Sequence, residues 1–100
     1  MRNREAREIR GRILKILDTN YPHPAGDRLI AEILSAAQYG CSPAQVTIHL
    51  AYLNEKGYIE LQEVESKELA ITRTLAKLTA KGKDLLEGNI DPDPGVDFDA

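Results

Sequence analysis

The chain has 100 residues, of which 42% are hydrophobic and 29% are charged, and this balance indicates one globular domain. Its net charge of −3 argues against a protein that binds any polyanion by charge alone. The one cysteine, Cys41, excludes an internal disulfide. No apolar run approaches the roughly 18 residues of a membrane span. The charged start MRNREAREIRGR is unlike a signal peptide, so we expect a cytoplasmic protein.

Residues 4–18 are predicted to form the first helix. Apolar side chains recur there at the spacing of one helix face: Ile9, Ile13, Leu14, Ile16 and Leu17. The other side is basic and carries Arg2, Arg4, Arg7, Arg10, Arg12 and Lys15. These groups could meet phosphates, but we favour a solvated face with pairs such as Glu8–Arg12. The same helix is the expected element for a homodimer.

A cluster of breakers at residues 19–26 separates this helix from a second one at residues 27–38. The second helix repeats the apolar pattern with Leu29, Ile30, Ile33, Leu34 and Ala37. Gly40 is expected to take the left-handed conformation that ends it.

The third helix has the best-defined start in the sequence. Ser42 at the cap, Pro43 at the first position and Gln45 three residues on form a capping box. Helical spacing then turns four side chains inward: Val46, His49, Leu50 and Leu53. Gly57 is expected to end the helix.

Residues 58–65 and 69–78 are predicted to be two strands of a hairpin, joined by a turn at residues 66–68. Leu75 and Leu78 have opposite phases along the second strand, so a bulge or an early strand end is expected near Leu75 or Ala76. A fourth helix follows, with Thr79 as its cap, Leu85 and Leu86 inward and Gly88 as its stop.

This order predicts a winged helix-turn-helix domain over residues 1–88, mainly α with a small β-hairpin as the wing. Residues 89–100 are rich in proline and aspartate, and they predict a flexible acidic tail.

The runs LNEKGYIE and LTAKGKDLLEG are similar to those of winged helix-turn-helix domains in general. A longer pattern, from LIAEILSAAQYGCSPAQVTIHLAYLNEKGYIEL through TLAKLTAKGKDLLEG to PGV, resembles small winged-helix proteins of Mu-like phages and prophages, with an ArsR-like fold. The resemblance spans about residues 9–96, and the matching positions are Ser42, Gln45, Val46, Leu50, Leu53, Glu55, Gly57, Leu78, Thr79, Gly82, Gly95 and Val96. It implies a phage-encoded regulator by fold analogy. The ending DFDA departs from the basic ending expected after PGV.

The outer side of the third helix is the first candidate site. It centres on Ala44, Ile48, Ala51 and Glu55 and carries no Arg or Lys. Groove-reading helices usually present Arg, Lys, Asn or Gln to base edges. Gln45, Thr47 and Asn54 could read bases, Ile48 could contact a thymine methyl group, and Tyr52 could reach phosphate. A small apolar strip of this kind suits a protein partner at least as well.

The wing is the second candidate site. Lys67 sits among Glu63, Glu65 and Glu68, whose carboxylates repel phosphate. Taken over the third helix and the wing, the side chains on which the DNA-binding hypothesis rests are Ser42, Gln45, Thr47, Ile48, Tyr52, Lys56, Lys67 and Arg73.

Neither an enzyme nor a metal site is expected. Cys41, His23 and His49 lack the spacing of metal ligands, and no nucleophile triad or phosphate loop is visible. His49 lies beside the apolar stripe and reads as a packed core histidine. We expect no cofactor. Two functions remain: a phage transcription regulator that binds double-stranded DNA in the host cytoplasm, or a module that binds a phage protein through the third helix.

Overall fold

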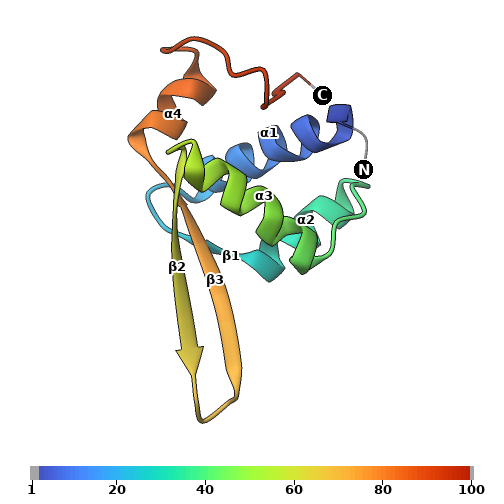
Figure 1. Ribbon diagram of the computed structural model, residues 1–100, viewed down its shortest axis with the longest axis vertical. Coiled ribbons are helices and arrows are strands. Elements are labelled where there is room, and N and C mark those ends of the chain that lie inside the picture. Colours follow the sequence, from blue (N-terminus) through green and yellow to red (C-terminus); the bar gives the residue numbers. More distant parts are fainter. Residues whose placement is uncertain (1–2, 100) are drawn as a thin grey trace.

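The computed structural model describes residues 3–99, with helices packed into a body from which one hairpin projects (Figure 1). The elements in chain order are α1 (Asn3–Asn20), β1 (Ala25–Gly26), α2 (Asp27–Ala36), α3 (Pro43–Glu55), β2 (Ile59–Ser66), β3 (Ile71–Leu78) and α4 (Ala80–Glu87). The hairpin of β2 and β3 gives the molecule its long axis of 45 Å. This arrangement confirms the predicted winged helix-turn-helix architecture.

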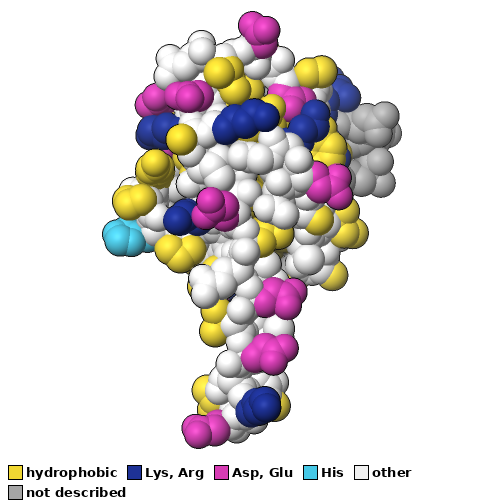
Figure 2. All heavy atoms as spheres, turned by 60° about the vertical axis from the view of Figure 1, so that its left-hand side comes forward, with side chains coloured by type: hydrophobic (Ala, Val, Ile, Leu, Met, Phe, Trp, Pro, Cys, Tyr) yellow, Lys and Arg dark blue, Asp and Glu magenta, His cyan; other side chains and the backbone are white. Residues whose placement is uncertain are grey.

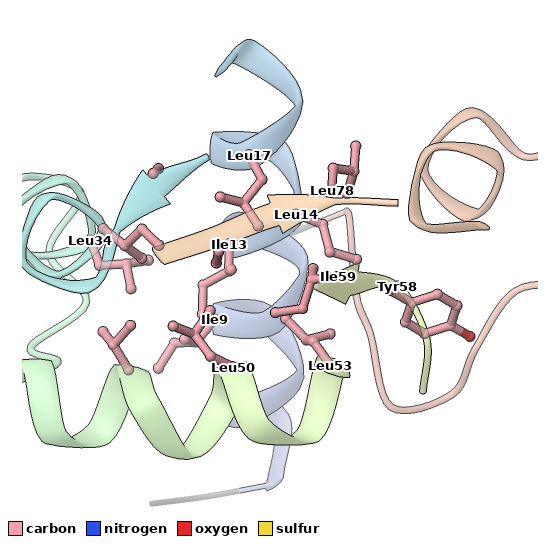
Figure 3. Close-up of a cluster of buried hydrophobic side chains, with 14 of the residues drawn as sticks. Ile9, Ile13, Leu14, Leu17, Leu34, Leu50, Leu53, Tyr58, Ile59 and Leu78 are labelled. Carbon is pink, nitrogen blue, oxygen red and sulfur yellow. The ribbon is translucent and has the colours of Figure 1, made fainter. Parts of the chain in front are cut away.

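Helix α1 runs through the centre of the domain. Its side chains Ile9, Ile13, Leu14 and Leu17 are completely buried, and α2, α3, α4 and β3 all contact the helix. Figure 3 shows these side chains meeting Leu50 and Leu53 of α3 and Ile59 of β2. Truncating one such side chain to alanine typically costs about 2–5 kcal/mol. The predicted apolar face of the first helix is therefore confirmed.

Helix α2 differs from its prediction in two respects. Its core face is narrow, with Ile30, Ala31 and Leu34 buried, whereas Leu29 and Ile33 are exposed. The helix also ends at Ala36, and the left-handed residue is Gln38, with φ 67°, so the prediction for Gly40 is wrong. The N–H of Tyr39 donates to the carbonyl of Leu34 at 2.8 Å, which closes the chain around Gln38.

The sheet contains a short strand that the sequence did not reveal. Strand β1 pairs with β3 at Ala25↔Ala76 and Gly26↔Leu75, and the sheet order is β1-β3-β2. The β2–β3 register runs without interruption from Ile59↔Leu78 to Ser66↔Ile71. The predicted bulge is therefore wrong. Leu75 and Leu78 differ in phase because Leu78 faces the core while Leu75 lies on the opposite, partly exposed face of the sheet.

The sequence predicts a disordered or loosely docked tail, and in the structure much of residues 89–99 lies against α1. Val96 is buried, and the N–H of Asp97 donates to the carbonyl of Arg7 at 3.0 Å. Arg10 Nη1 donates to the carbonyl of Gly95 at 3.2 Å, and Lys15 Nζ donates to that of Phe98 at 2.5 Å. The side chains of Arg10 and Lys15 and the backbone carbonyl of Arg7 thus hold the backbone of the acidic tail.

A buried carboxylate fastens the tail to the end of α3. Tyr58 Oη donates to Asp93 Oδ2 at 2.6 Å, and Lys56 Nζ lies 3.2 Å from the same oxygen. The N–H of Gly95 donates to Asp93 Oδ1 at 2.8 Å. We call Lys56, Tyr58, Asp93 and Gly95 the tail latch.

The tail latch changes the acid–base properties of two of its members. Burial acts to raise the pKa of Asp93, but the hydrogen bonds from Tyr58 and Gly95 and the Lys56 ammonium together lower it below its usual value. Burial, followed by the hydrogen bond to Asp93, raises the pKa of Tyr58 to about 12. At neutral pH the latch therefore holds an ionised Asp93 and a neutral Tyr58.

Substitution of Gly11 by alanine is expected to displace the tail from α1. A Cβ at this position would lie 1.9 Å from the carbonyl oxygen of Asp97, whereas a Cβ at Gly40 would meet nothing within 4 Å. In Gly11→Ala, hydrogen exchange of the Asp97 N–H should quicken by at least about tenfold, although alanine is the better helix former by roughly 1 kcal/mol. Unchanged exchange in Gly11→Ala, with Gly40→Ala as the control, would contradict the observed docking.

The latch also predicts that stability declines at high pH. Tyrosines of the unfolded chain ionise near pH 10, whereas Tyr58 keeps its proton in the folded chain until its pKa of about 12. The folded state therefore binds more protons between these values, and the free energy of unfolding should fall there by up to about 1.4 kcal/mol per pH unit. Urea unfolding measured across this window should show a shallower decline in Tyr58→Phe, and parallel declines would disprove the assignment.

Candidate nucleic-acid interface

Helix α3 begins with the predicted capping box. Ser42 Oγ accepts a hydrogen bond from the N–H of Gln45 at 3.2 Å, and Gln45 Oε1 accepts one from the N–H of Ser42 at 2.9 Å. Gly57, with φ 82°, follows the last turn, as predicted. The two caps fix the ends of the helix and therefore which of its residues face outward.

The two sides of α3 have the predicted contents. Val46, His49, Leu50 and Leu53 are buried on the inner side. On the outer side Ile48 is 69% exposed, and Ala44, Ala51 and Glu55 are exposed with it. We call Ala44, Ile48 and Ala51 the outer strip. Its side chains are small or apolar and carry no charge.

Polar groups beside the outer strip are partly engaged with their own helix. Thr47 Oγ1 donates to the carbonyl of Pro43 at 3.0 Å, and Gln45 uses its side-chain oxygen in the capping box. Thr47, Gln45 and Asn54 are all exposed. The structure therefore brings Ser42, Gln45, Thr47 and Ile48 together at one exposed surface, which includes half of the side chains on which the DNA-binding hypothesis rests.

Tyr52 and Lys56 lie elsewhere. The guanidinium of Arg10 stacks 3.8 Å from the centroid of the Tyr52 ring, and a Cβ on Gly95 would lie 2.0 Å from Tyr52 Oη. Lys56 belongs to the tail latch, where the hydrogen bond and charge of Asp93 raise its pKa. Tyr52 faces α1 and the tail, Lys56 faces the tail, and neither belongs to the outer strip.

The wing is mixed in charge. Lys67 lies in the exposed turn, and Arg73 is partly buried opposite Val64, with Nη1 3.2 Å from the carbonyl oxygen of Thr72. Figure 2 shows acidic side chains along the hairpin and a basic one near its tip. The strands and turn contain four glutamates, Glu60, Glu63, Glu65 and Glu68, against three basic residues, Lys67, Arg73 and Lys77. Lys77 is already paired with Glu60 at 3.6 Å.

A cleft of about 660 Å³ between α2 and the start of α3 presents a further basic residue. Arg28, Glu32, Ser42 and Pro43 are among its lining residues, and Arg28 is exposed. In the sequence Arg28 stands between Asp27 and apolar residues and forms no cluster, so no pattern there points to it as a site residue. Its position beside the start of α3 becomes apparent only once α2 and α3 are packed together.

Of the three residues considered for metal binding, His23 is exposed, whereas His49 and Cys41 are buried. His49 is 4% exposed, and burial, followed by the charge of Arg10, lowers its pKa. Cys41 is buried, and burial raises the pKa of its thiol. Within residues 3–99, no three His, Cys, Asp or Glu side chains are grouped closely enough to hold a metal ion. No helix in this part of the chain is long and apolar enough to cross a membrane.

Neither a protein-family model nor a curated protein matches the chain. Several solved structures do. The chain is 21% identical to a PadR family transcription regulator from Clostridium difficile, with a TM-score of 0.65 over 81% of each chain. It is 23% identical to a PadR-like transcription factor from Bacteroides fragilis, with a TM-score of 0.67 over 81% of this chain and 75% of that one.

A third similar structure is Bacillus subtilis PadR in complex with operator DNA, at 18% identity and a TM-score of 0.65. The match covers 86% of this chain and 51% of that one, so the present chain corresponds to about half of that protein. Together these likenesses establish that the chain has the winged helix-turn-helix fold of these regulators.

Proposed function

We propose that this protein is a transcription regulator that binds double-stranded DNA by inserting α3 into the major groove. The observation that carries the proposal is the exposed outer strip on a helix capped at both ends and buried along its inner side. The wing projects beyond the same body (Figure 1). The PadR structure with operator DNA supports the proposal, because it has the same fold.

The outer strip suits apolar contacts more than a dense set of hydrogen bonds. Ile48 and the two alanines can meet thymine methyl groups, and their small size allows the helix backbone to approach the base edges. Thr47, Gln45 and Asn54 are exposed beside them for hydrogen bonds. We therefore propose that the operator is recognised partly through thymine methyls.

Phosphate contacts are few in this proposal. Arg28 lines the cleft beside the start of α3, and Lys67 and Arg73 lie on the wing. Within residues 3–99 none of the three forms an ion pair with a carboxylate. Glu63 and Glu65 lie on the same wing, and their negative charges repel phosphate. Each phosphate contact contributes about −0.9 to the slope of log affinity against log salt, so the slope should lie near −3.

The resemblance to Mu-like phage proteins supports a further proposal, that the genes regulated are those of a phage.

A homodimer that pairs through α1 would have to use the ends of the helix. Most of α1 is covered, and its exposed residues within the described part of the chain are Arg4, Glu5, Thr19 and Asn20.

Binding to a labelled duplex of mixed sequence tests the proposed function. Anisotropy titrations between about 50 and 200 mM salt should show binding with a slope near −3. Ile48→Glu should weaken binding by at least about tenfold, because it places a carboxylate in the groove. Arg28→Ala should reduce the slope by about one. Ile90→Glu, at the other end of the molecule, is the matched control and should bind as the unmodified chain does.

Absence of binding at the lower salt concentration would overturn this proposal. It would favour the alternative in which the outer strip binds a phage protein, since an uncharged exposed strip beside an acidic wing also suits a protein surface. Ser42 and Gln45 are unsuitable for this test, because their substitution would remove the capping box and about 0.5–2 kcal/mol of helix stability with it.

A further inference from the structure

A groove of about 540 Å³ lies between α4 and the tail. Its floor is apolar, with Leu86, Ile90, Pro92 and Phe98 among the lining residues. Ile90 is 37% exposed, and Leu86 and Phe98 are partly buried against the core. The groove therefore presents apolar surface to solvent, and two of its lining side chains also pack against the hydrophobic core.

The rim of this groove is acidic. Glu87, Asp97 and Asp99 line it, and Arg7 is the one basic lining residue among the described ones. Glu87 lies 3.7 Å from Lys83 Nζ and accepts a hydrogen bond from Asn89 Nδ2 at 3.3 Å. From residue 84 to residue 99 the sequence contains no Lys or Arg. Figure 2 shows acidic and apolar side chains together at the end of the molecule opposite the wing.

The groove is formed in advance of binding. One wall is α4, which Thr79 caps by accepting a hydrogen bond from the N–H of Gly82 at 3.1 Å. The other wall is the tail, held to α1 by buried Val96 and by Asp97. A preformed groove avoids the entropy cost of ordering its walls when a ligand binds.

We propose that this groove binds a basic amphipathic helix of a partner protein. Apolar side chains of such a helix, spaced by three and four residues, would enter between Leu86, Ile90 and Phe98. Its Lys and Arg side chains would meet the carboxylates of the rim. The site lies at the end opposite the wing (Figure 1), so it does not depend on the proposed DNA contacts.

Three labelled synthetic peptides test this proposal with the full chain. One is an amphipathic helix of leucine and lysine, the second has the same composition in an order without an apolar face, and the third replaces lysine by glutamate. The first should bind at least about tenfold more tightly than either control, and its affinity should fall as salt rises.

Variants locate the binding surface. Ile90→Ala should weaken binding of the first peptide by about fivefold or more, as expected for lost apolar contact. Leu69→Ala is the matched control, because Leu69 is 69% exposed at the tip of the wing, and its binding should be unchanged. Glu87→Gln should weaken binding at low salt, whereas Glu65→Gln on the wing should not.

Three outcomes would overturn the proposal. Equal binding of the two lysine peptides would show attraction by charge alone, and equal losses in Ile90→Ala and Leu69→Ala would place the peptide elsewhere. Concentration-dependent self-association that Ile90→Ala abolishes would show that a second copy of the chain occupies the groove. Circular dichroism of each variant confirms that it is folded.

Discussion

Burial of Val46, Leu50 and Leu53 against α1 is the constraint on which the arrangement of the candidate site depends. All three side chains are fully buried, and Figure 3 shows Leu50 and Leu53 on the side of α3 that faces Ile9 and Ile13 of α1. The directions of side chains around a helix are fixed relative to one another, so burying these three turns Ile48 outward. Rotating α3 to hide Ile48 would expose three core side chains, at about 1.5–3 kcal/mol each.

Local signals in the sequence were sufficient for the existence of the four helices and for the phase of α3, although not for the end of α2. The capping box of Ser42 and Gln45 and the helix ends at Gly57 and Gly88 each involve residues only a few positions apart, and the sequence predicts all of them. The predicted inner residues of α3 are all buried for the same reason. The exposed outer strip, which follows from that phase, was therefore predictable as well.

Features that depend on distant contacts were not predictable in this way. Strand β1 has two residues and exists only because β3 lies beside it. The left-handed conformation at Gln38 follows from the hydrogen bond between Tyr39 and Leu34, although a glycine stands two residues later. The angular position of Tyr52 borders the outer face and favours a base or phosphate contact, but the Arg10 guanidinium and the tail hold it on the other side.

The distribution of charge along the sequence also overstates how much positive charge the first helix leaves unpaired. The basic start and the acidic end appeared as separate segments, whereas the structure joins them. Arg10 and Lys15 donate to carbonyls of the tail, and Arg4 lies 3.5 Å from Glu8. Much of the local positive charge is thus used within the molecule. Composition could not show this, because the hydrogen bonds go to backbone carbonyls, which every sequence contains.

The tail latch connects the tail to the orientation of α3. Tyr52 and Lys56, in and just after the last turn of α3, contact Arg10 and Asp93, and Tyr58 holds Asp93 from the start of β2. Turning or shifting the end of α3 would break the ion pair and leave Asp93, which is 9% exposed, without the Lys56 ammonium. An unpaired buried charge is costly, so the latch holds α3 in one position. A helix held in one position loses less conformational entropy when it binds a groove or a partner, and this offsets part of the affinity that its uncharged outer strip lacks.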